Sequence, residues 1–146
     1  MNQIKAKVIR INATDIVTYI DVQSADTEIR LIKSKAPLWL CEGDTIHCNF
    51  NEASVCVSKD CPGKVSIENR VPATLVEVRK SDSLCELTFE SDVGKIVSLI
   101  TMEAFEDLEL ELGCQATMLL RGIDISVEPI VDFKKGFLER NMQIRS

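Results

Sequence analysis

The chain has 146 residues, of which 45% are apolar and 27% charged, and its formal net charge is −6. No apolar run approaches the roughly 18 residues that a membrane span needs, and no long apolar stretch follows Met1, so we expect a soluble, cytoplasmic protein without a signal peptide. Residues 66–130 hold five basic and thirteen acidic residues. This balance argues against general nucleic-acid binding, which needs cations to replace the counterions of phosphates.

Short runs rich in β-branched residues, separated by polar turns, predict ten β-strands, five in each half of the chain. The strands are expected at residues 4–11, 16–22, 28–33, 45–50, 55–57, 71–79, 84–90, 95–100, 115–121 and 124–128. After the third strand of each half we expect one short helical element: a short turn or single helical turn at residues 34–40, and a helix at 101–108, where Thr101 precedes an acidic first turn. This element order is typical of an OB-like β-barrel.

The second half of the chain repeats the first. A shift of 67 positions, which grows to 70 further along, aligns Asn2 with Asn69, Ala6 with Ala73, Ile29 with Ile96, Gly43 with Gly113 and Val55 with Ile125. We therefore divide the chain into a first module at 1–59, a linker at 60–65, a second module at 66–130 and a tail at 131–146. Copies of about 60–65 residues are near the lower limit for folding alone, so we expect them to pack on each other or on further chains. The tail is predicted to be a short helix or arm.

Six cysteines raise the question of a disulfide scaffold or a metal site. They stand at positions 41, 48, 56, 61, 85 and 114, and no two of them have Cys-x-x-Cys spacing. Several lie inside apolar strand patterns, as Cys56 does between Val55 and Val57. We expect reduced structural thiols and no metal site.

Several short motifs, in the same order in both halves, resemble one family. Residues 66–72 (Ser-Ile-Glu-Asn-Arg-Val-Pro) look like its opening Ser-Ala-Arg-Asn-x-Leu-x pattern, and residues 99–104 (Leu-Ile-Thr-Met-Glu-Ala) look like its Leu-Ile-Thr-x-Glu-(Ser/Ala) pattern. Residues 120–125 (Leu-Arg-Gly-Ile-Asp-Ile) and, more weakly, 50–55 (Phe-Asn-Glu-Ala-Ser-Val) look like its closing Ile-Lys-Ala-(Ser/Thr)-x-Val strand. The chain thus resembles the Mop/TOBE, or molbindin-like, family of molybdate- and tungstate-binding domains, in its tandem di-Mop arrangement.

The resemblance implies OB-like barrels that assemble into homo-oligomers and hold a tetrahedral oxyanion between subunits, without catalysis and without an organic cofactor. Molybdate or tungstate offers four acceptor oxygens and two negative charges, so its site needs backbone N–H groups, hydroxyls and a cation or two. The residues that the resemblance assigns to this site are Asn51, Ala53, Ser54, Ser66, Ile67, Glu68, Asn69, Thr101, Arg121, Gly122 and Ile123.

Three of these candidates also have a purely structural interpretation. Ser66 fits a linker serine that turns the chain. Arg121 fits a surface cation that faces Asp124 or Glu128. Thr101 fits a plain helix N-cap, although one residue can serve both purposes.

Two departures from the family pattern bear on binding. Glu68 stands where the family has its opening Arg, and Asn51 stands where it has its closing Lys. A carboxylate beside a dianion is repelled by it. The site is therefore either rebuilt, with Arg70 or Lys64 supplying the charge, or lost.

Two functional hypotheses from different classes follow. The first is a non-catalytic protein that binds molybdate or tungstate for storage, homeostasis or sensing linked to molybdate transport. The second is a degenerate TOBE module that has lost the oxyanion and docks on a transporter ATPase or a regulator. A nucleic-acid-binding OB module would need exposed aromatics on a basic face, and seven aromatic residues in an acidic chain argue against it. We expect no nucleic-acid and no membrane partner.

Overall fold

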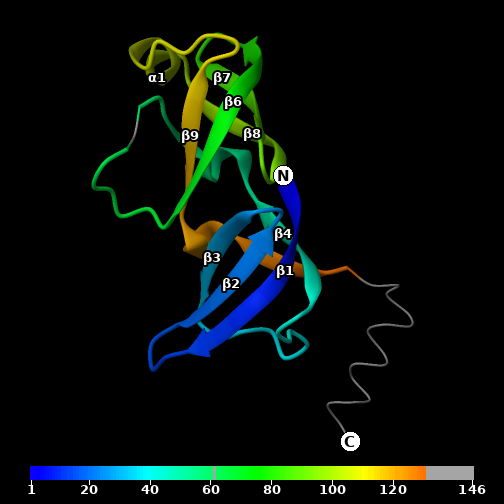
Figure 1. Ribbon diagram of the computed structural model, residues 1–146. Helices are drawn as coiled ribbons and strands as arrows, with labels where there is room; N and C mark the ends of the chain where they lie inside the picture. Colours follow the sequence, from blue (N-terminus) through cyan, green and yellow to red (C-terminus); the bar gives the residue numbers. More distant parts are fainter. Residues whose placement is uncertain (61, 131–146) are drawn as a thin grey trace, which may run out of the picture.

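The computed structural model describes residues 1–60 and 62–130, and over this part the protein is all-β. Two five-stranded antiparallel sheets lie one above the other (Figure 1). The elements in chain order are β1 (Asn2–Ala13), β2 (Thr18–Ser24), β3 (Thr27–Lys33), β4 (Thr45–Phe50), the 3₁₀ turn η1 (Glu52–Ser54), β5 (Cys56–Ser58), β6 (Asn69–Lys80), β7 (Leu84–Ser91), β8 (Gly94–Thr101), the helix α1 (Met102–Asp107), β9 (Gln115–Leu120), the 3₁₀ turn η2 (Gly122–Asp124) and β10 (Ser126–Pro129). The prediction of an all-β protein with two five-stranded units is confirmed.

The two sheets exchange their last strands. One sheet has the order β10-β4-β1-β2-β3 and the other β5-β9-β6-β7-β8. Strand β5 follows the first four strands in sequence but pairs with β9, with Cys56 opposite Leu119. Strand β10 closes the second half in sequence but pairs with β4, with Val127 opposite Cys48. The boundaries at 59 and 66 therefore divide the repeat in the sequence, whereas each sheet takes strands from both sides of them.

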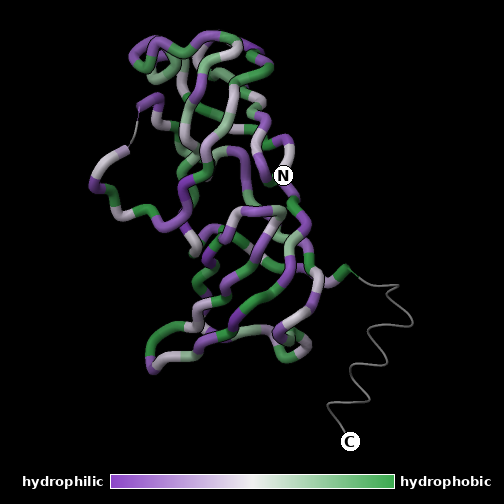
Figure 2. The backbone as a smooth tube through the Cα atoms, in the orientation of Figure 1, coloured by the Kyte–Doolittle hydropathy of each residue, from purple (hydrophilic) through white to green (hydrophobic). Residues whose placement is uncertain are grey.

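The strands follow from alternation of apolar and polar residues, which a pleated strand turns to opposite faces. Along β1 the side chains of Ile4, Ala6 and Val8 are buried and the residues between them are exposed, and Figure 2 shows the two kinds of residue interspersed along both sheets. The register slips after Val8 in β1 and after Leu75 in β6, the same position of the repeat. Each of these bulges bends a long strand and bonds to the turn before the fourth strand of its half.

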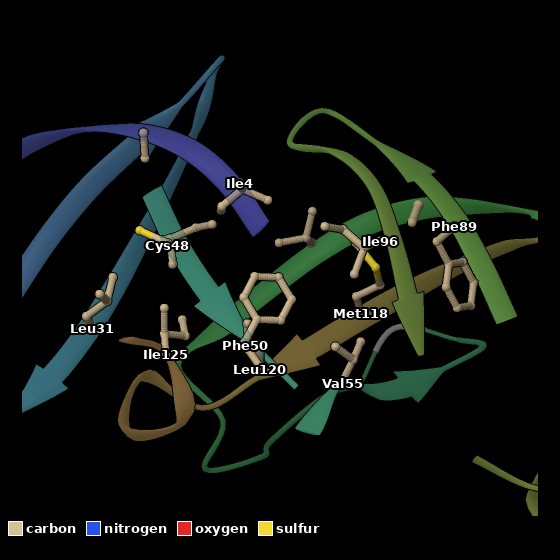
Figure 3. Packing of buried hydrophobic residues seen from close by; sticks show 14 of the residues in the cluster. Ile4, Leu31, Cys48, Phe50, Val55, Phe89, Ile96, Met118, Leu120 and Ile125 are labelled. Carbon is tan, nitrogen blue, oxygen red and sulfur yellow. The ribbon is translucent and has the colours of Figure 1, made fainter. Parts of the chain in front are cut away.

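The buried side chains form one cluster that extends through both sheets. Phe50 of β4 and Leu120 of β9 lie close together in Figure 3, with Ile125 and Leu31 on one side and Met118 and Ile96 on the other. The two modules thus share apolar packing, as expected for copies too small to bury a sufficient core alone.

Two buried asparagines join the sheets by backbone hydrogen bonds. The amide side chain of Asn2 donates to Val97 O (2.8 Å) and accepts from Val97 N (2.9 Å) at the edge of β8. Asn69 does the same at the edge of β3, donating to Arg30 O (2.9 Å) and accepting from Arg30 N (2.8 Å). Both pairs occupy equivalent positions of the repeat. Each amide satisfies an edge strand that would otherwise present unpaired backbone groups.

Of the two predicted helical elements, the structure contains the second as a helix. Helix α1 forms inside the predicted range 101–108, and the hydroxyl oxygen of Thr101 accepts from Ala104 N (3.0 Å) as its N-cap. Residues 34–40, expected as a short turn or a single helical turn, form bends and a turn in which Leu40 N donates to Pro37 O (3.1 Å), so the short helix expected in the first half does not form. Pro37 lacks an N–H and restricts Ala36 before it, which disfavours a helix through this stretch. No described helix is long and apolar enough to cross a membrane, and the tail expected at 131–146 lies outside the described residues.

Candidate functional site

The opening and closing segments of the second repeat meet between the two sheets. Asn69 pairs with Leu120 in the β6–β9 ladder, and just beyond this pair Gly122 N donates to Glu68 Oε2 (3.0 Å). We call the region formed by residues 66–69 and 121–124 the joint. The structure therefore brings the candidates Glu68 and Asn69 against the segment of Arg121 and Gly122, and Ser66, Ile67 and Ile123 are their neighbours in sequence.

Strand β3 of the other sheet forms the floor of the joint. Gly122 is buried against it, and a Cβ atom at this position would lie 2.5 Å from Arg30 O and 3.2 Å from Ile32 N. Glycine is required because only a residue without a side chain lets two backbones approach so closely. The 3₁₀ turn η2 is thus pressed onto β3, while Ile123 is left 64% exposed beside it.

One cation, Arg121, belongs to the joint and a second, Lys33, lies near it, and both interact with Asp124. Nε and Nη2 of Arg121 each lie 2.9 Å from Asp124 Oδ2, and the Arg121 side chain is 62% exposed. Lys33, at the end of β3, has its pKa lowered by burial, an effect that the nearby carboxylate of Asp124 partly offsets. The sequence analysis missed Lys33, because its place beside η2 depends on how β3 passes under the joint.

The two cations proposed to replace the family's opening Arg have different positions. The guanidinium of Arg70 donates to the carbonyl oxygens of Gly63 (2.9 Å), Val65 (3.0 Å) and Ile67 (3.4 Å). Arg70 therefore holds the segment before β6 in place, and its guanidinium N–H groups donate to backbone oxygens of that segment. Lys64 is exposed, as is Ser66.

The equivalent region of the first repeat is built differently. Asn51, at the position of Arg121, uses its side-chain oxygen to accept from Ala53 N (2.8 Å) and caps η1. The carboxylate of Glu52 pairs with the amino group of Met1, and this bond holds the pKa of Glu52 below its usual value. Ala53 is exposed and Ser54 half-buried. These residues cap and turn the chain, and Asn51 brings no positive charge.

Thr101 lies away from both regions. Its segment pairs with the start of β7, opposite Leu84, and α1 sits at the end of the molecule remote from η2 (Figure 1). Its hydroxyl is engaged as the N-cap described above. The structure thus gives Thr101 the capping role that the sequence analysis held open.

The five cysteines within residues 1–60 and 62–130 are single thiols. Cys48 and Cys85 are buried, and burial raises the pKa of Cys48 to about 12. Among the described residues, no three or more His, Cys, Asp and Glu side chains gather as a metal site would require.

Comparison with known proteins gives one family match and a match to a solved structure. The TOBE domain family matches residues 65–121, and a sequence search of curated proteins gave no match. A crystal structure of the cytoplasmic molybdate-binding protein ModG, in a form with molybdate bound, has the same fold at a TM-score of 0.82 and 19% sequence identity, covering 88% of this chain and 96% of that chain. Residues 65–121 of this chain thus match the TOBE domain family, and the chain shares its fold with ModG.

Proposed function

We propose that this protein binds a molybdate- or tungstate-class oxyanion at the joint, without catalysis, and serves cytoplasmic storage, homeostasis or sensing of that anion. The observation that carries the proposal is the convergence of residues 66–69 and 121–123 on β3, in a fold shared with a molybdate-binding protein. The two motifs that resemble the family's opening and closing patterns contain Glu68 and Gly122, the two residues that form this contact.

The joint offers the kinds of donor that a tetrahedral dianion needs. Gly122 contributes a backbone N–H, Ser66 an exposed hydroxyl, and Arg121 and Lys33 two cations. Arginine has five N–H donors, and Asp124 engages the Nε and Nη2 groups of Arg121. The remaining donors of Arg121 are sufficient for a charge-assisted bond to an oxyanion.

These donors also indicate a site shared between chains. The side chain of Arg121 is 62% exposed, and Ser66 and Ile123 are exposed as well. Tight binding of an anion requires more complete removal of water. We propose that a second copy covers the joint and completes the site, and that a molybdate transporter ATPase or a regulator is the further partner.

One observation favours a second candidate function. The equivalent contact of each repeat contains a carboxylate, that of Glu68 against Gly122 N in the second repeat and that of Glu52 against the amino group of Met1 in the first. In this alternative the module no longer holds an oxyanion and acts by docking on a transporter ATPase or a regulator.

Calorimetric titration with molybdate, tungstate and sulfate, combined with native mass spectrometry, separates the two functions. We expect saturable heat with molybdate or tungstate and a change in subunit number when the anion binds. Replacing Arg121 by Ala removes a charge-assisted bond and should weaken binding by about 10- to 100-fold. The control is Arg79→Ala, which removes the same charge from an exposed position in β6. No heat at high micromolar anion in the unmodified protein would favour the docking function.

A further inference from the structure

The carboxylate of Glu68 occupies a donor that the proposed oxyanion site requires. Gly122 N donates to Glu68 Oε2 at 3.0 Å. An ionised carboxylate only accepts hydrogen bonds, and the Gly122 amide has one N–H to give. Glu68 and an oxyanion therefore compete for the same donor, and their like charges oppose their binding side by side.

This contact is held from both sides. Asn69, the neighbour of Glu68, is 5% exposed and fixed by its two hydrogen bonds to Arg30. Gly122 is pressed onto β3 so closely that its backbone has no room to move inward. The side chain of Glu68 is exposed apart from this bond, so it can swing away while the amide stays in place.

The charged groups near the contact between Glu68 and Gly122 interact with partners other than Glu68. Arg121 and Asp124 of η2 bond to each other, Lys33 lies near Asp124, and Arg70 is bound to carbonyl oxygens of the segment before β6. Arg30, on β3, is paired through its side chain with Asp21. Within the described residues none of these cations forms an ion pair with the Glu68 carboxylate, so its hydrogen bond to Gly122 N is the interaction that an anion has to replace.

We propose that Glu68 sets the affinity of the joint for oxyanions: its carboxylate is an internal ligand of Gly122 that an oxyanion must displace. This inference rests on the proposed oxyanion binding and adds the residue that sets its threshold. The internal ligand weakens binding of every fully ionised oxyanion, and it restricts the site to anions whose contacts with Gly122, Arg121 and Lys33 together outweigh the carboxylate.

The decisive experiment compares molybdate binding by the full chain and two matched variants. Glu68→Gln keeps an oxygen that can accept from Gly122 N but removes the charge. Glu90→Gln removes the same charge from an exposed position in β7. We expect Glu68→Gln to bind molybdate at least tenfold more tightly than the unmodified protein, and Glu90→Gln to change the Kd by less than twofold. Equal effects of the two variants, or weaker binding by Glu68→Gln, would overturn the inference.

A measurement without anion tests the contact itself. In ¹H–¹⁵N spectra, Glu68→Ala should move the Gly122 amide proton upfield and speed its exchange with water, because the amide loses its acceptor. An unchanged Gly122 signal would contradict the inference.

The outcomes also separate this inference from the proposed function. If the unmodified protein binds molybdate and Glu68→Gln binds it equally well, oxyanion binding stands and the role of Glu68 is refuted. If Glu68→Gln alone binds, the role of Glu68 is supported and the unmodified protein is not an oxyanion-binding protein. If neither binds, both proposals are refuted.

Discussion

At the scale of single residues, the clearest electrostatic feature is Asp21, which is 3% exposed on β2 between Arg10 of β1 and Arg30 of β3. Its carboxylate accepts from Arg30 Nε (2.8 Å) and from Arg10 Nε (3.2 Å). The hydrogen bond from Arg30, followed by that from Arg10, holds the pKa of Asp21 below its ordinary value, and burial opposes this only in part. An acid with a lowered folded-state pKa stabilises the protein above its unfolded pKa, and this stability is lost as the pH falls through the folded value.

We therefore expect Asp21→Asn to lower the free energy of unfolding at pH 7 by about 1–3 kcal/mol, since the bonds to charged partners weaken. The difference from the unmodified protein should shrink below about pH 4, where an aspartate in the unfolded chain takes up a proton. Urea denaturation at pH 7, 5 and 3.5 measures this. Asp15→Asn, in the exposed turn before β2, is the control and should have little effect. A difference that stays constant down to pH 3.5 would contradict the assignment.

At the same scale, the candidate site was partly predictable from the sequence. Glu68 and Gly122 are 54 positions apart, and the repeat and the motifs were sufficient to propose that their segments meet. The sequence could not show what each polar group binds. Arg70 turns to the carbonyl oxygens of its own linker, a result of loop conformation, and Lys33 reaches the joint because of how two sheets pack. Neither leaves a signal in local residue patterns.

At the scale of elements, the strands were predictable and their partners were not. Residues 55–57 and 125–127 have similar apolar patterns at equivalent positions of the repeat. Either segment therefore fits the edge of either sheet, and pairing within its own half or with the other half would bury similar side chains. The exchange seen in β5 and β10 is decided by the path of the chain through η1 and η2.

The close contact of η2 with β3 gives a prediction at this scale. Gly122→Ala places a methyl group 2.5 Å from Arg30 O, a backbone atom within a sheet, so η2 must lift from β3. We expect a loss of about 1–3 kcal/mol in the free energy of unfolding, as for other overpacked sites. The control is Glu52→Ala at the equivalent position in η1, which loses a partly exposed ion pair worth at most about 1 kcal/mol. Thermal melting of the two variants provides the comparison. A Gly122→Ala protein as stable as the unmodified one would contradict the close packing of η2 on β3.

At the scale of the whole molecule, the repeat was visible in the sequence, but it suggested two units where the structure has one interlocked body. Each sheet lends a strand to the other, the buried cluster extends through both, and Asn2 and Asn69 each bond to an edge strand of the opposite sheet. If one half of the chain were removed, the sheet of the other half would lose one strand, part of the shared core and the asparagine that bonds to its edge strand. The two modules are therefore expected to fold and unfold together.

This cooperativity can be measured because the chain has one tryptophan, Trp39, which lies in the first half and reports on that part, whereas far-UV circular dichroism reports on both sheets. We expect both signals to show one coincident transition.

Asn69→Ala leaves the N–H and C=O of Arg30 without the partners they have now. It should lower the free energy of unfolding by about 1–3 kcal/mol and shift both signals equally, although the residue replaced belongs to the second half. Asn12→Ala, at the exposed end of β1, is the control. Two separate transitions, or a shift in circular dichroism without one in Trp39 fluorescence, would mean that the modules are independent and that the exchanged strands do not couple them.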